Sequence, residues 1–130
     1  MKFLIFLPLL LAGCASSDQH QALLDDYAAT AASGDLSQTL TGAALFEAQQ
    51  SQRLLAQLGW RQEGVSRFTN LQGLGEGVFS SCLDISAVRF FDQQNQPVEI
   101  DRSNERLLMR ITFDSGPTSK IALLEEVGLC

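Results

Sequence analysis

The spacing of apolar residues changes near the middle of the chain, from a helical repeat to an alternation. Up to residue 58, leucine and alanine recur every three or four positions, which is typical of amphipathic helices. The pattern predicts a first helix over 19–32, capped by Asp18, and a second helix over about 42–58. Gly59 is expected to end the second helix, because glycine adopts the left-handed conformation that closes helices.

Beyond Trp60 the chain is expected to form strands joined by short polar turns. The clearest alternation lies over 106–113, where apolar and polar side chains would point to opposite faces of a sheet. Helices followed by a meander of antiparallel strands predict an α+β domain, with the N-terminal helices packed on one face of a curved antiparallel sheet. The predicted strands are 61–69, 76–85, 87–92, 98–100, 106–113 and 119–127, with turns at 70–75, 93–97 and 114–117.

The first fourteen residues have a pattern of their own. Lys2 precedes an apolar run over 3–11, which is far shorter than the roughly 20 residues that a transmembrane helix needs. The small residues Ala12 and Gly13 then precede Cys14, as the cleavage site of an export signal requires.

This arrangement, ending in Leu11-Ala12-Gly13-Cys14, resembles the lipobox signal peptide of bacterial lipoproteins. The resemblance implies that residues 1–13 are cleaved and that Cys14 carries a diacylglyceryl thioether on a short tether, 14–18. Two or more acyl chains give stable anchoring. The alternative is a non-lipidated signal peptide in which the cysteine is incidental.

The implied location is the bacterial cell envelope. Ala15 follows the modified cysteine, which favours the periplasmic side of the outer membrane in a Gram-negative cell. In a Gram-positive cell the same anchor would hold the protein on the outer face of the plasma membrane.

The remaining chain, 19–130, is expected to be a single domain large enough to form its own core. Loss of Lys2 would leave eight of the nine basic residues against fifteen acidic ones, a net charge of −7. A chain this acidic argues against nucleic acid and against electrostatic binding to anionic lipids. The lipid on Cys14 is therefore the expected membrane contact.

The chain has three cysteines, and lipid on Cys14 would leave Cys82 and Cys130 in an oxidising compartment. A disulfide between them is the most economical arrangement, worth about 4 kcal/mol in the chain-entropy model. Two free thiols are the alternative. A metal pair is disfavoured because there is one histidine and no CxxC spacing, and we expect no metal and no cofactor.

A second resemblance extends over most of the chain. It rests on Tyr27 in the first helix, Thr41-Gly42-Ala43-Ala44-Leu45, Gly59, Cys82-Leu83-Asp84 and Gly128-Leu129-Cys130. These segments resemble small exported lipoproteins with an NTF2-like, or cystatin-like, α+β fold. The resemblance implies a cone with a pocket between helix and sheet, and a mid-sheet cysteine paired with a terminal one. It implies no particular activity.

Enzymes with the NTF2-like fold often use a pocket Asp or Tyr, so the resemblance makes Tyr27, Asp84 and Arg110 possible pocket residues. Trp60, with several phenylalanines, could line an apolar ligand pocket. Each residue also has a structural interpretation: a core tyrosine and tryptophan, a turn-forming aspartate, and a solvated arginine on the sheet face. We assign no catalytic residue.

Two further features favour structural interpretations. His20 is the only histidine, and we expect it to be a solvated surface residue. The GxGxG run over 73–77 has no following Lys-Ser/Thr, so a hairpin is favoured over a phosphate-binding loop.

The functional expectation is a non-enzymatic, membrane-anchored envelope lipoprotein that binds another envelope protein through its sheet or helix face. One alternative is a carrier or sensor of a small apolar ligand in the pocket. Another is an isomerase or dehydratase-type enzyme of the NTF2-like kind.

Overall fold

The structure is a computed structural model that describes residues 7–101, 103–116 and 119–130, with the backbone alone described over 7–17. Lys2 and the side chain of Cys14 lie outside this described part, as does part of the predicted turn over 114–117.

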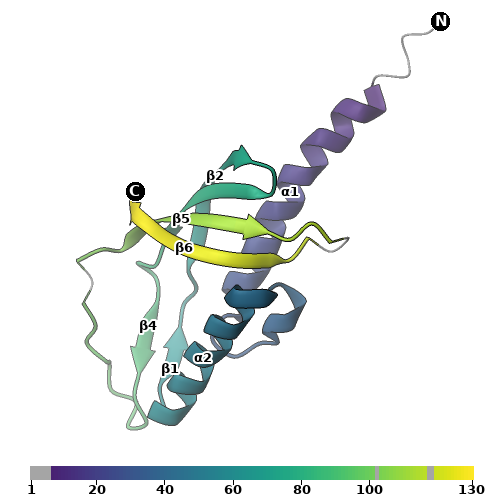
Figure 1. Cartoon of the computed structure of the whole chain (residues 1–130). Helices are drawn as coiled ribbons and strands as arrows, with labels where there is room; N and C mark the ends of the chain where they lie inside the picture. Colours follow the sequence, from purple (N-terminus) through teal and green to yellow (C-terminus); the bar gives the residue numbers. More distant parts are fainter. Residues whose placement is uncertain (1–6, 102, 117–118) are drawn as a thin grey trace, which may run out of the picture.

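Two α-helices precede the strands (Figure 1). The first, α1, spans Leu7–Thr30, so it begins earlier than the predicted residue 19. Asp18 therefore lies inside the helix and does not cap it, and the backbone of residues 14–18 is helical. Leucine and alanine, which are strong helix formers, are frequent before Asp18 and favour this continuation.

The second helix, α2, spans Gly42–Leu58, as the sequence predicted. Gly59 ends it in the left-handed conformation, with φ of 70° and its N–H bonded to the carbonyls of Ala56 and Leu55. A short 3-10 helix, η2 (Leu36–Gln38), precedes α2, and the Asp35 carboxylate caps η2 by accepting from the Ser37 N–H at 3.0 Å.

The main sheet is antiparallel, with strand order β2-β3-β5-β6. Its strands are β2 (Arg67–Gly75), β3 (Val78–Asp84), β5 (Arg106–Phe113) and β6 (Ile121–Leu129). α1 contacts β2 and α2 contacts β6, so helices flank both edge strands of the sheet. Two helices on an antiparallel sheet confirm the predicted α+β class.

A separate two-stranded ribbon interrupts the meander. It pairs β1 (Arg61–Glu63) with β4 (Arg89–Phe91), and Figure 1 shows it to the lower left, away from the main sheet. The expected strand over 98–100 is wrong, because these residues form no strand. Pro97, just before them, forms an isolated bridge with Phe91, and the Val98 N–H donates to the Phe90 carbonyl. Proline has no N–H with which to extend the pairing.

The prediction of a turn over 70–75 is also wrong, because β2 continues through this segment to Gly75. Asn70 has a φ of 56°, and the pairing with β3 shifts register between Thr69 and Gln72. Asparagine tolerates this conformation, so a bulge absorbs the turn-forming residue without ending the strand. The chain instead reverses at Glu76-Gly77, within the glycine-rich run that was predicted to be a hairpin.

The core lies between the helices and the inner face of the sheet. Ile111 on β5 and Ile121 on β6 are fully buried, against Leu24 of α1 and Leu40 before α2. Ile121 also exchanges backbone hydrogen bonds with this region, donating to the Thr39 carbonyl and accepting from the Thr41 N–H. The last strand is thereby bonded directly to the segment between η2 and α2.

The predicted Cys82–Cys130 disulfide is present. Cys82 pairs with Leu108, and Leu108 pairs with Gly128, so the bond joins β3 to the end of β6 across the intervening β5. It thereby holds Cys130, which directly follows β6, to the middle of the sheet.

Candidate functional site

A cavity of about 210 Å³ lies between the helices and the main sheet. Three small side chains of α2, Ala44, Ala48 and Ser51, line it at a spacing of four and three residues. This spacing places them on one face of the helix, and their small size leaves space between the helix and the strands.

The inner wall of the cavity is apolar. It is formed by one side chain from each strand of the main sheet, so the wall spans the whole sheet. Phe68 and Met109 are buried, which makes this wall part of the hydrophobic core. The four side chains are Phe68, Leu83, Met109 and Leu124.

Tyr27 of α1 lines the cavity next to this wall, with its ring centroid 6.1 Å from that of Phe68. Burial raises the pKa of its hydroxyl, so the phenol is protonated at neutral pH. Within the described part of the chain, no hydrogen bond to this hydroxyl is formed. Tyr27 thus supplies a neutral group that can donate or accept a hydrogen bond.

The other polar lining residues are Glu47, Ser51 and Ser66. Glu47 lies on the exposed side of α2, so its carboxylate remains in contact with solvent. Among the described residues that line the cavity, Glu47 is the only charged one, and no lysine or arginine accompanies it. The site therefore combines an apolar interior with three hydroxyl groups and one negative charge.

The other three residues predicted for a pocket do not join Tyr27. Trp60 lines a different cavity of about 280 Å³, together with Gln52 and Leu55 of α2 and Arg61 of β1. Its ring centroid lies 6.3 Å from that of Phe90. Trp60 therefore connects the end of α2 to the two-stranded ribbon.

Asp84 and Arg110 have structural partners. Asp84 ends β3 and accepts a hydrogen bond from the Ser86 N–H at 2.9 Å, and hydrogen bonds from Ser86 lower the pKa of its carboxyl. Arg110 projects from β5 and forms a bidentate pair with Glu125 of β6, at 3.2 and 3.1 Å. Asp84 is thus a turn former and Arg110 an exposed cross-strand partner.

The expectation that His20 is a solvated surface residue is wrong. The centroid of its ring lies 4.2 Å from the ring centroid of Phe113 and 4.7 Å from that of Phe79. Nε2 lies 3.4 Å from the Ser119 hydroxyl, whereas Nδ1 is buried and has no hydrogen-bond partner among the residues that the structure describes. Burial lowers the pKa of the imidazole, which favours its neutral form.

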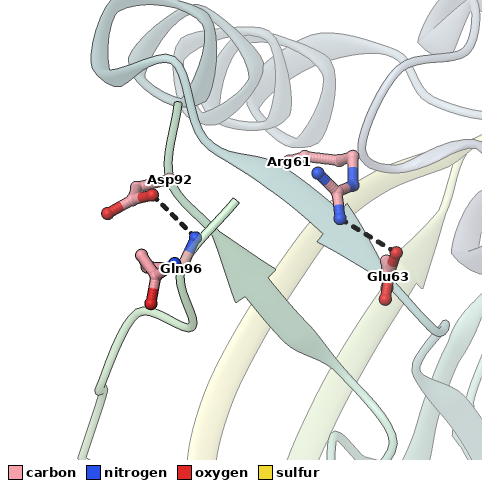
Figure 2. A network of polar contacts seen from close by, with 4 residues as sticks. All are labelled: Arg61, Glu63, Asp92 and Gln96. Carbon is pink, nitrogen blue, oxygen red and sulfur yellow. Dashed lines mark hydrogen bonds and ion pairs between the residues drawn. The ribbon is translucent and has the colours of Figure 1, made fainter. Parts of the chain in front are cut away.

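A polar network in the two-stranded ribbon maintains local structure (Figure 2). Arg61 and Glu63 form an ion pair at 3.0 Å on β1, and the Arg61 guanidinium lies 4.9 Å from the centroid of the Phe91 ring. After β4, the Asp92 carboxylate accepts from the Gln96 N–H at 2.9 Å and closes the polar loop. The Arg61–Glu63 pair is exposed, so it adds little to stability.

The sequence predicted Tyr27 as a residue of the cavity but missed Glu47, Ser51 and Ser66.

Among the described residues, no helix is both long and apolar enough to cross a bilayer. Within the same part of the chain, no three His, Cys, Asp or Glu side chains cluster as metal ligands would.

Comparison with known protein families, with characterised proteins and with solved structures finds no match to this chain.

Proposed function

We propose that this protein is an exported, lipid-anchored, non-enzymatic binding module of the bacterial cell envelope. The observation that carries the proposal is the Cys82–Cys130 disulfide. Disulfides form and persist in oxidising compartments and are rare in the cytosol. Their pairing also leaves Cys14 as the remaining cysteine, in agreement with the lipobox resemblance of residues 11–14.

The partner we propose is another envelope protein, bound by the outer face of α2. Phe46, Leu54 and Leu58 are 58%, 54% and 41% exposed on this helix. With Gln50 they form a row spaced four residues apart, which is the ridge that helices use to pack against one another. We call this row the α2 ridge.

The non-enzymatic assignment is supported by the positions of the residues that the sequence predicted for a pocket. An isomerase or dehydratase would need an acid–base pair converging in a cavity that excludes water. Tyr27 lines the cavity, but Asp84 is hydrogen-bonded to Ser86 in a turn and Arg110 is paired with Glu125. The carboxylate that does line the cavity, Glu47, is exposed to solvent.

The anchor is tested by expressing Cys14→Ser beside the wild-type chain in a bacterium and separating soluble from membrane fractions. We expect the wild type in the membrane fraction, with incorporation of labelled fatty acid, and the variant without label in the soluble fraction. A Ser16→Ala variant is the matched control and should behave as the wild type. Membrane retention of unlabelled Cys14→Ser would contradict the anchor.

A second candidate function is the binding of a small apolar molecule. It is favoured by the cavity of about 210 Å³, with its apolar wall and its Tyr27 hydroxyl. Pockets for small molecules commonly combine apolar walls with a few polar groups that orient the ligand. Such binding is compatible with a protein partner on the α2 ridge, because Phe46, Leu54 and Leu58 are not among the described residues that line the cavity.

A further inference from the structure

We propose that the cavity beside Tyr27 binds small amphiphiles whose polar end is an ammonium group, and that it discriminates against carboxylates of the same shape. This inference rests on the second candidate function, because it requires that the cavity bind a ligand. It goes further by assigning the chemical class of that ligand.

The size of the cavity sets the size of the ligand. A dry apolar cavity of about 150 Å³ is enough to hold benzene. The space of about 210 Å³ beside Tyr27 therefore accommodates a phenyl ring with a short side chain. Phe68, Leu83 and Met109 would contact the ring, and the polar end would lie toward the rim.

The chemistry of the rim sets the charge of the ligand. The hydroxyl groups of Tyr27, Ser51 and Ser66 can each donate or accept, so they bind ammonium, alcohol or carboxylate groups without strong preference. Glu47 supplies the only charge among the described lining residues, and it attracts cations and repels anions. The net charge of the whole chain, −6, acts in the same direction.

The basic residue next to Ser66 in the chain, Arg67, does not reverse this preference for cations. Arg67 follows Ser66 but lines a neighbouring pocket, together with Gln21 and Asp25. Asp25 lines the same pocket, and Arg67 is the cross-strand partner of Asp84, so residues of negative charge accompany this arginine. Arg67 is absent from the lining of the cavity beside Tyr27.

The test uses three probes of nearly equal shape: 2-phenylethylamine, 2-phenylethanol and phenylacetate. The full chain, purified in detergent, is labelled with ¹³C-methyl methionine, and each probe is titrated while the Met109 methyl resonance in the cavity wall is followed. Titration into protein-free micelles corrects for partition of the probe. We expect the amine to bind at least three-fold more tightly than the carboxylate at low salt, a size typical of an exposed charge.

Two variants separate the ligand class from binding itself. Glu47→Gln should reduce the difference between the affinities for the amine and the carboxylate to the part that the net charge of the chain contributes, while leaving the affinity for 2-phenylethanol within two-fold. Ala48→Leu should fill the cavity and abolish binding of all three probes. The matched controls are Glu76→Gln in the turn between β2 and β3 and Ala43→Leu on the exposed face of α2, which should leave all three affinities unchanged.

The outcomes are distinguishable. If 2-phenylethanol binds but the carboxylate binds as tightly as the amine, the ammonium preference is overturned while the cavity remains a ligand site. If no probe shifts the Met109 resonance, both the ligand class and the second candidate function are overturned. Glu47 is exposed, so its variant remains informative even if Ala48→Leu fails to fold.

Discussion

Cys82 on β3 and Cys130, the last residue of the chain, are covalently joined across β5. The two residues are 48 positions apart, so the bond closes a long loop that contains β4, β5 and β6. A crosslink of this length removes much of the conformational freedom of the unfolded chain.

We therefore expect the Cys82→Ala/Cys130→Ala variant to lose about 3–4 kcal/mol of unfolding free energy. Urea unfolding of the variant and the wild type, monitored by circular dichroism, measures the loss. The Cys14→Ser variant is the control for removal of a cysteine and should unfold like the wild type. A double variant of unchanged stability would show that the bond does not constrain the unfolded chain.

A second prediction concerns the loss of folding stability in acid. The pKa of His20 is lowered in the folded protein, so in the interval just below its ordinary value of 6.5 the unfolded chain binds the proton more readily. The contribution of His20 to the unfolding free energy is therefore fully present above pH 6.5, and it is lost as the pH falls toward the lowered pKa of the folded state. The groups near the ring include the Ser119 hydroxyl and the rings of Phe79 and Phe113, and Ser119 also donates to the backbone carbonyl of Asp114.

Urea unfolding at about pH 7.5 and about pH 5.5 tests this linkage. We expect the wild type to lose more unfolding free energy between these two values than His20→Gln does. Because His20 is the only histidine, the difference between the two chains isolates its contribution. Equal losses in both chains would show that burial of the imidazole is not linked to folding.

A third prediction concerns Gly64, which separates β1 from β2. Its φ of 74° is unfavourable for a residue with a side chain, and a methyl group there would collide with the backbone carbonyl of Ala87. We expect Gly64→Ala to cost about 2 kcal/mol of unfolding free energy.

Gly75 provides the matched control, because a methyl group there would meet no atom within 4 Å. Thermal unfolding of Gly75→Ala should differ little from that of the wild type. A Gly64→Ala melting temperature equal to that of Gly75→Ala would mean that the ribbon of β1 and β4 adapts without strain.

The fourth prediction concerns the proposed protein partner. Phe46→Ser/Leu54→Ser should abolish crosslinks formed in living cells between this chain and its envelope partner, since it removes two apolar side chains from the α2 ridge. Both residues are more than half exposed, so the fold should remain intact. Leu74→Ser, at an equally exposed leucine of β2, should leave the crosslinks unchanged; if it abolishes them instead, the partner binds elsewhere.

Local signals were sufficient where neighbouring residues determine the structure. Gly42 and Gly59 bound α2, and alternation alone located Arg106–Phe113. The bulge at Asn70 was missed because pairing with β3 outweighs the turn preference of one residue. The environment of His20 could not be foreseen, since Ser119 is 99 positions away.

The residues of the cavity likewise include some that local sequence could predict and some that depend on distant contacts. Small residues on one face of α2, including Ala44 and Ala48, were recognisable in the sequence, and Tyr27 was singled out. Glu47 and Ser66 were missed because they become neighbours only when α2 packs against the sheet. The clue in the sequence was the lack of large side chains on a face of α2 that must cover a hydrophobic wall.

The hydrogen bonds of Ile121 with Thr39 and Thr41 determine when the domain can be completed during its synthesis. The helices leave the ribosome early, but the strand to which this segment bonds begins only at Ile121. The disulfide likewise cannot form before Cys130 has been translated. A nascent chain of this protein therefore remains open until β6 has been synthesised, and a chain that terminates before Ile121 cannot make these bonds.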